Sequence, residues 1–427
     1  MSQESPPRLT CLGKATLLLL AGVAFGALFY GLFRFVNFAT PGRSTITSSS
    51  TDASSSPNSS SSAGSVASTA PAASADHQAP AKSGSVEFGI AYGTEKERWL
   101  KWAVAEYAKS EAGAGVTVNL IPMGSLEGAQ AVLAEDKRIH VWSPASAAYT
   151  DVFEEEWKSK FEGEPILRTD ALALSPMVFV MWEERYQAFA AKYGTMSFAT
   201  LGQALAEKTG WAGIAGKPEW GLFKLGHTHP NESNSGMVTL VLMAYAFHQK
   251  CQGLELADIL DLNFQNQMTS FERAVSGLPN STGNLMRDMV LKGPSAYDAV
   301  VVYESVAIDY LANAEGRWGK LRIAYPSLNM WNENPYYVLN VPWSSPQQRE
   351  AAGKFLDFLM TEPIQREALV HGFRPGNPSV PIRVAGSPFE KYAAFGLQVD
   401  IANACQAPRA EVLNNLLASW QRAQGSR

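Results

Sequence analysis

Short runs of hydroxyl residues and glycine carry the most evident chemistry in this sequence. Five such runs each follow a strand-like stretch and precede a helix-like stretch: 93–94, 124–125, 143–146, 233–236 and 303–305. Helix starts carry unpaired N–H groups and partial positive charge, and in open α/β sheets ligands bind beyond the carboxyl ends of the strands. The runs therefore predict one site that surrounds a small ligand, such as an anion, with donors. The residues expected to bind it are Thr94, Ser125, Ser143, Ser146, Ser233, Asn234, Ser235 and Tyr303.

Other roles are open for these residues. Each Ser or Thr is also an ordinary helix N-cap, and only their joint placement favours a binding cleft. Three carboxylates beside the runs would repel an anion, which leaves a cationic group on the ligand as an alternative: Glu95, Glu127 and Glu304. Three aromatic residues could stack on an organic ligand, although packing in the core is the expected role for each: Tyr92, Trp142 and Trp331.

The elements that must position these runs alternate between strand and helix. Strand-like stretches cover 86–91, 116–122, 139–142, 177–182, 221–225, 297–303, 321–325 and 336–341. Thr94 and Glu97 have the spacing of a capping box, and Ser345 followed by Pro346 is a strong helix start. The alternation predicts an α/β fold with mostly parallel strands and helices on both faces.

A catalytic alternative has little support in the sequence. His227 and His229 could share a metal with His140 or His371, but no further ligand is fixed by spacing. The chain has no HExxH, no GxSxG, no P-loop and no GxGxxG after a strand. We therefore expect no catalytic residues, no metal and no cofactor, and a metal-dependent hydrolase is the less favoured reading.

Composition excludes several classes of protein. Of the 427 residues, 46% are hydrophobic and 18% are charged, which is globular, and a net charge of −5 without a basic block argues against nucleic acid as a partner. None of the three cysteines has metal-ligand spacing. Cys251 and Cys405 could pair in an oxidising compartment, but two buried free thiols are the expectation.

The N-terminal region predicts an anchor and a tether. Residues 15–33 are uncharged and would span about 28 Å as a helix, close to the hydrocarbon thickness of a bilayer. Bulky residues follow them, so we expect an uncleaved anchor rather than a removed signal. The expected divisions are a cytoplasmic tail (1–14), a transmembrane signal anchor (15–36) and a disordered Ser/Thr/Ala/Pro linker (37–84) with a reach of roughly 35 Å.

Four stretches resemble type II periplasmic solute-binding proteins. They are the helix 347–359 followed by TEPIQREALVHGFRPGNPSV, then WGLFKLGHTHPNESNSGMVTLVLMAYAF, AYDAVVVYES and YPSLNMWNENPYYVLNVPW. The match covers roughly 85–380, and its motifs are most similar to the molybdate- and sulfate-binding branch. The resemblance implies an α/β fold of two lobes joined by two crossover strands, with lobe I at 85–178 and 340–427 and lobe II at 179–339.

The resemblance also implies a function. It predicts an extracytoplasmic protein, held at the cell membrane by one span, that captures a small ligand between its lobes without catalysis. The expected partners are that ligand, the membrane and an ABC-type permease. A ligand-sensing or interaction module that signals to another membrane partner fits the anchor and linker equally well.

Overall fold

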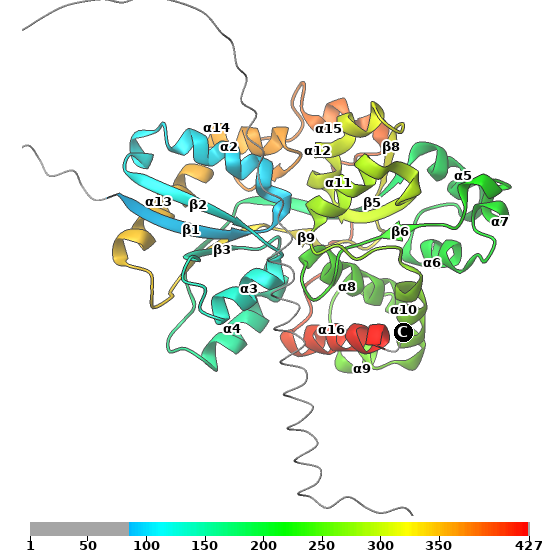
Figure 1. Ribbon diagram of the computed structural model, residues 1–427, viewed down its shortest axis with the longest axis horizontal. Coiled ribbons are helices and arrows are strands. Elements are labelled where there is room, and N and C mark those ends of the chain that lie inside the picture. Colours follow the sequence, from blue (N-terminus) through cyan, green and yellow to red (C-terminus); the bar gives the residue numbers. More distant parts are fainter. Residues whose placement is uncertain (1–84, 426–427) are drawn as a thin grey trace, which may run out of the picture. The chain divides into compact units, whose positions relative to one another are not determined.

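The computed structural model describes residues 85–425, which contain two β-sheets (Figure 1). The first sheet has the strand order β2-β1-β3-β10-β4. Its strands are β1 (Val86–Tyr92), β2 (Val116–Pro122), β3 (Val141–Ser143), β4 (Ile166–Ala171) and β10 (Pro335–Leu339). From Phe88 onward every residue of β1 is buried, as expected for a central strand with helices on both faces.

The second sheet is built around one long strand. The order is β11-β5-β7-β6, and β8 and β9 also pair with β5. The strands are β5 (Ala173–Trp182), β6 (Leu225–Gly226), β7 (Ala299–Tyr303), β8 (Leu321–Ala324), β9 (Trp331–Asn332) and β11 (Arg374–Pro375). The strand expected at 221–225 is confined to the two residues of β6.

The strand directions correct the expectation of mostly parallel sheets. β1 is parallel to β2 and β3, and β6 is parallel to β7, but β10 and β5 run antiparallel to their neighbours. The physical reason is that β10 and β5 belong to the segments in which the chain passes from one sheet to the other. Each of these strands enters its sheet from the other sheet rather than through a crossover helix from a neighbouring strand, so it need not run parallel to its neighbours.

Helices cover both sheets. Those beside the first sheet are α2 (Glu97–Tyr107), α3 (Ser125–Leu133), α4 (Thr150–Lys158), α13 (Pro346–Leu359) and α14 (Glu362–Val370). Those that follow strands of the second sheet are α5 (Glu183–Tyr193), α6 (Phe198–Ala206), α7 (Trp211–Ala215), α8 (Asn234–His248), α9 (Leu256–Ile259), α10 (Leu262–Ala274), α11 (Thr282–Lys292) and α12 (Glu304–Glu315). The last two helices are α15 (Pro388–Lys391) and α16 (Ala410–Gly425).

Two local helix signals had different outcomes. The capping box at Ser345 is confirmed, since the Ser345 side chain accepts from the Gln348 N–H while the Gln348 side chain accepts from the Ser345 N–H. The capping box at Thr94 is wrong. The chain forms a short 3-10 turn, η1 (Thr94–Lys96), whose cap is Gly93, and α2 begins only at Glu97.

The chain passes between the sheets at three places. Leu172 lies between β4 and β5, the turn at 333–334 lies between β9 and β10, and the segment after α14 enters β11. α16 packs against α8, α9 and α10 and also contacts α4, so it lies against helices of both sheets. The lobe boundaries drawn from the sequence stay a prediction. The last helix, α16, contacts helices from both groups.

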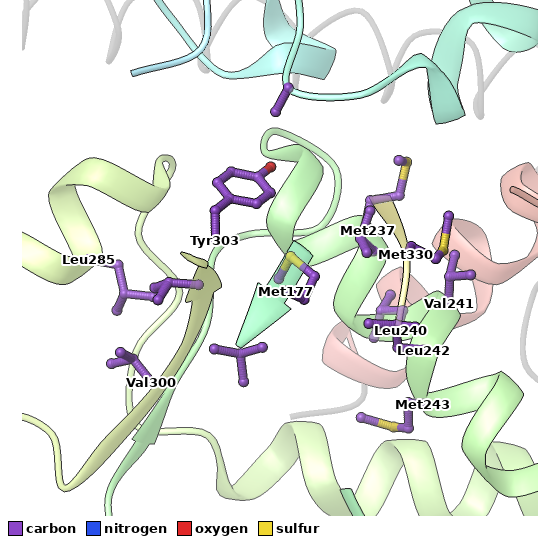
Figure 2. Close-up of a cluster of buried hydrophobic side chains, with 14 of the residues drawn as sticks. Met177, Met237, Leu240, Val241, Leu242, Met243, Leu285, Val300, Tyr303 and Met330 are labelled. Atoms are coloured by element: carbon purple, nitrogen blue, oxygen red, sulfur yellow. The ribbon is translucent and has the colours of Figure 1, made fainter. Parts of the chain in front are cut away.

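The largest hydrophobic cluster extends from α8 to β5 and β7. Residues 234–245 of α8 are all buried, which is typical of a helix in the interior of a large core. Figure 2 shows the methionines and aliphatic residues of this cluster, with Tyr303 at its end and the phenol oxygen pointing away from the labelled hydrophobic side chains. The core thus holds β7 and α8 rigidly, and the polar residues at their ends are placed by it.

One cysteine expectation is wrong, and one group of expectations lies outside the described residues. Cys251 and Cys405 form a disulfide, because the segment 403–406 runs beside Cys251 and brings the two Cα atoms to 4.5 Å. The predicted tail, anchor and linker, 1–84, lie outside the described residues. Within 85–425, no helix has the length and hydropathy that a membrane crossing needs.

Candidate functional site

Three of the predicted site residues meet at one buried amide. Asn234, the first residue of α8, accepts a hydrogen bond of 2.7 Å from Ser146 Oγ through its Oδ1. Its Nδ2 donates to the phenol oxygen of Tyr303 and to Oδ1 of Asn332, both at 2.9 Å. Ser146 follows β3 of the first sheet, whereas Tyr303 and Asn332 belong to the second. The amide therefore joins the two sheets with every polar atom of its side chain in use.

A chain of hydroxyl groups lies beside this amide. Ser235 Oγ lies 2.7 Å from Thr228 Oγ1, 2.6 Å from Thr282 Oγ1 and 3.4 Å from Ser233 Oγ. All four residues are buried, and Ser235 and Thr282 stand in the first turns of α8 and α11. The pKa of Tyr303 is raised well above its ordinary value by burial and by the charge of Glu95, so the phenol keeps its proton.

Two further predicted site residues, Ser125 and Ser143, form hydrogen bonds with backbone groups and not with each other. Ser125 Oγ accepts from the N–H of Ala145 at 3.0 Å, and Ser143 Oγ donates to the carbonyl of Pro335 at 2.8 Å. Both bonds fix the segment 143–146, which carries Ser146 toward Asn234. Their observed role is to shape that loop.

Thr94 lies at the edge of the group. A Cβ atom added at Gly283 would stand 3.2 Å from Thr94 Oγ1, so η1 packs closely on the start of α11. The Thr94 hydroxyl is buried and has no hydrogen-bond partner among the described residues. It lines a small cavity of about 60 Å³ that also involves Glu95, Arg98 and Arg287. The close packing leaves little room for a side chain at position 283.

The three carboxylates beside the runs are each engaged by a donor. Glu95 forms an ion pair with Lys96, and Glu127 accepts from the N–H of Gly124 at 3.0 Å. Both oxygens of Glu304 accept hydrogen bonds of 2.8 Å from Arg374. Burial raises the pKa of Glu304, and Arg374 opposes that shift. These pairings remove most of the repulsion that the sequence predicts for an anion.

Lys96 is a buried cation that sequence reasoning missed. Its Nζ also donates to the carbonyl of Pro144 at 3.2 Å and to Oδ1 of Asn334 at 3.0 Å, and the side chain is fully buried. Burial lowers the pKa of Lys96, while Glu95 acts in the opposite direction. The cation thus ties η1 to the loop after β3 and to the passage between the sheets.

Three asparagines line that passage and pair with the backbone of one strand. Nδ2 of each donates to a carbonyl of β5: Asn329 to Met177 at 2.8 Å, Asn332 to Ser175 at 3.0 Å, and Asn334 to Ala173 at 3.1 Å. Asn334 has a φ of 46°, a left-handed conformation that asparagine tolerates better than most residues. The side chains replace ladder hydrogen bonds at the point where the chain turns between the sheets.

The aromatic and histidine alternatives are accounted for by packing. Trp142 is buried between Phe153 and Tyr337 and donates to the carbonyl of Ser125 at 3.0 Å. Both ring nitrogens of His227 are engaged, by Glu272 at 3.0 Å and by the carbonyl of Thr228 at 2.8 Å. In the part of the chain that the structure describes, no cluster of three His, Cys, Asp or Glu side chains could hold a metal ion.

Sequence reasoning missed several residues that take part in these contacts: Lys96, Thr228, Thr282, Asn332, Asn334 and Arg374. All except Thr228 bond a residue that is distant in sequence, whereas Thr228 contacts Ser235 seven positions away. Thr228, Asn332, Asn334 and Arg374 lie in the stretches that resemble solute-binding proteins, but residue type and local spacing did not identify their partners.

Comparisons with known proteins bear on this fold. A family model of bacterial extracellular solute-binding proteins matches residues 88–374. None of the curated protein sequences matches the chain. The sulfate-binding protein SubI from Mycobacterium tuberculosis H37Rv superposes with a TM-score of 0.51 and 17% identity, over 73% of this chain and 92% of its own.

Two other solved structures are similar to a comparable degree. A periplasmic thiamin binding protein gives a TM-score of 0.56 at 14% identity, over 79% of this chain and 96% of its own. AfuA from Actinobacillus pleuropneumoniae gives 0.51 at 13% identity, over 79% and 98%. At these identities the likeness establishes the fold alone. Because the family model spans well over half of the chain and the fold agrees with it, the chain belongs to the bacterial extracellular solute-binding proteins and has the type II periplasmic binding fold.

Proposed function

We propose that this protein is a membrane-tethered, extracytoplasmic receptor that captures a small oxyanion between its two sheets and presents it to an ABC-type permease. The observation that carries the proposal is the buried junction of Ser146, Asn234 and Tyr303, continued by the hydroxyl group of Ser235. The tether is the anchor expected at 15–36 and the linker at 37–84. The disulfide between Cys251 and Cys405 supports an oxidising compartment.

The chemistry of the junction favours an oxyanion. Four helical segments begin at it, at Thr94, Asn234, Thr282 and Glu304, and helix starts offer N–H groups and partial positive charge to an anion. The side chains at the junction are hydroxyls and amides that can donate to oxygen. The nearest carboxylates are already paired, with Lys96 and Arg374 among their partners. Two of the similar structures are of proteins that bind oxyanions, the sulfate-binding protein SubI and AfuA with fructose-6-phosphate bound.

The same junction does not favour catalysis. A hydroxyl nucleophile needs a base within hydrogen-bond distance. The hydrogen-bond partners of the Ser146 and Ser235 side chains among the described residues are amide groups and other hydroxyls, and none is a histidine or a carboxylate. In the proposal, the direct bonds across the junction belong to a closed arrangement, and a ligand exchanges some of them for its own oxygens.

Thermal unfolding of the full-length protein in mild detergent tests the proposal. Sulfate, molybdate and phosphate are added separately, with chloride at matched ionic strength as the reference. A ligand at a hundred times its Kd adds about 2.7 kcal/mol of stability. We expect Ser235→Ala to raise the Kd for the anion at least tenfold, so that the same anion concentration stabilises the variant less. Ser197→Ala, which removes an N-cap hydroxyl at the start of α6, is the matched control and should bind the anion with the wild-type Kd. No stabilisation by any of the three anions would overturn the oxyanion proposal.

A further inference from the structure

The chain after the family match forms a separate layer on the second sheet. The family model ends at residue 374, and residues 375–425, named here the C-terminal strap, continue beyond it. The strap pairs with the passage between the sheets at Ala404 and Asn329 and is joined to Cys251 through Cys405. It ends in α16, which contacts α8, α9 and α10 and also α4. The strap therefore touches α8, which carries Asn234 and Ser235, and helices that belong to both sheets.

A buried chain of polar contacts runs from α16 toward the site. Trp420 Nε1 donates a hydrogen bond of 2.6 Å to Oε2 of Glu272, and Oε1 of the same carboxylate lies 3.0 Å from Nε2 of His227. Glu272 and His227 are fully buried, and Trp420 is 2% exposed. The carbonyl of Thr228, 2.8 Å from Nδ1 of His227, can only accept, so that nitrogen carries a proton. The ring of His229 also packs edge-on against Trp420.

These polar contacts end at the proposed ligand loop, residues 227–236. His227 is followed by Thr228, whose hydroxyl contacts Ser235. A Cβ atom added at Gly236 would stand only 2.2 Å from the Thr228 carbonyl, so the loop closes tightly on the start of α8. A displacement of His227 would therefore move Ser235 and Asn234 as well, because the two ends of the loop are in direct contact.

A second contact of the strap reaches the other ligand loop. The carbonyls of Gln398 and Val399 accept from Arg374, and the N–H of Gln398 donates to the Tyr325 hydroxyl at 3.2 Å. Arg374 and Tyr325 both donate to Glu304, which follows Tyr303 directly. The strap thus supports 303–305 through Arg374 and Tyr325, and 227–236 through Trp420.

We propose that the C-terminal strap positions the two ligand loops of the second sheet, and that Trp420 is a positioning residue that acts on 227–236 through Glu272 and His227. This inference rests on the ligand site proposed above. It differs from a purely structural role for α16, because loss of the Trp420 N–H donor should change the loop more than it changes the rest of the fold.

The test compares two buried tryptophans that each donate one hydrogen bond. Trp420→Phe keeps an aromatic ring and removes the donor to Glu272. Trp157→Phe makes the same change on α4, where the indole donates to the carbonyl of Gly163 at 3.0 Å, away from the ligand loops. Hydrogen–deuterium exchange of the full-length protein without ligand is followed at 227–236. We expect at least tenfold faster exchange there in Trp420→Phe and no change in Trp157→Phe.

Affinity provides the second measurement. The affinities for sulfate and molybdate, measured by titration, should be about tenfold lower in Trp420→Phe and unchanged in Trp157→Phe. If Trp420→Phe does not fold, Glu272→Gln replaces it, since glutamine keeps the side-chain volume and should give the same rise in exchange. Equal exchange at 227–236 in the variant and the control would overturn the positioning role. If the wild-type protein binds neither anion, the oxyanion proposal fails, and the exchange comparison still decides whether the strap positions the loop.

Discussion

Arg374 donates two hydrogen bonds of 2.8 Å to the carboxylate of Glu304, one from Nε and one from Nη2. Both side chains are buried, with 5% of Arg374 and 0% of Glu304 exposed. Since Glu304 directly follows Tyr303, this ion pair fixes the start of α12 and the phenol beside it. A charge left alone in such a place is costly, because neither water nor another cation replaces the lost partner.

We expect Arg374→Met to lower the free energy of unfolding by about 3–5 kcal/mol, the usual cost of removing one partner of a buried ion pair. Urea denaturation at pH 7 measures this change. The double variant Arg374→Met with Glu304→Gln should recover part of the loss, because it leaves no unpaired charge. A loss below about 1 kcal/mol in the single variant would show that water reaches Glu304 and that the pair is not isolated.

Asn234→Asp tests the amide that joins the sheets. The substitution keeps the shape but removes both N–H donors, so Oδ1 of Asn332 loses its partner. Asn332 cannot rotate to compensate, since its Nδ2 already donates to the carbonyls of Ser175 and Met330. We expect a loss of at least about 1–3 kcal/mol in urea denaturation, the cost of an unsatisfied buried group, and weaker binding of sulfate through charge repulsion.

Ser146→Ala is the milder companion of Asn234→Asp. It removes the hydrogen bond that Asn234 accepts and the one that Ser146 Oγ accepts from the N–H of Ala148, and it introduces no charge, so we expect a loss of about 1–2 kcal/mol. Wild-type stability in Asn234→Asp would mean that the carboxyl is protonated or that the junction opens freely in solution.

The sequence predicted the positions of the strand ends better than the partners that meet there. Ser146, Asn234 and Tyr303 were all placed at helix starts, because N-cap chemistry is local and can be seen in a few residues. That Asn234 would bond both Ser146 and Tyr303 depends on how two sheets close on each other, which no local pattern contains. The ligand-binding roles of these residues stay predictions.

Remote contacts also account for one wrong expectation, the free thiols, and for one residue missed in the sequence, Lys96. Cys251 and Cys405 are separated by 154 positions, and their pairing follows from the path of the segment after α15. Lys96 reads as a surface residue at a helix start, yet it is fully buried because Glu95, Pro144 and Asn334 all supply acceptors around it. In both cases the decisive contact is made by chain that is remote in sequence.

Replacing both cysteines by serine should destabilise the protein. A cross-link that closes a loop of 154 residues restricts the unfolded chain, and for loops of this size the chain-entropy model gives up to about 5 kcal/mol. We expect Cys251→Ser with Cys405→Ser to lower the free energy of unfolding by about 2–5 kcal/mol. Dithiothreitol should destabilise the wild-type protein and leave the double variant unchanged. Equal sensitivity of the two proteins to the reductant would contradict the pairing.

The pH dependence of stability offers a test of the buried His227 and Glu272 pair. Burial opposes a charge on His227, but the Glu272 carboxylate and the Thr228 carbonyl outweigh it, and the pKa of His227 is raised above 6.5. A histidine with a raised pKa binds its proton more tightly in the folded state than in the unfolded chain. Its contribution is therefore fully present below pH 6.5 and is lost as the pH rises through the folded pKa.

Comparison with His227→Gln isolates this contribution, because the other titrating groups are common to both proteins. Each unit by which the pKa is raised corresponds to about 1.4 kcal/mol. Urea denaturation at intervals from pH 6 to pH 9 should show the wild-type advantage over His227→Gln shrinking as the pH increases. Glu272 is the charged partner of His227 in the part of the chain that the structure describes, so Glu272→Gln should abolish the trend. An advantage that stays constant across this range would mean that His227 is neutral in the folded protein.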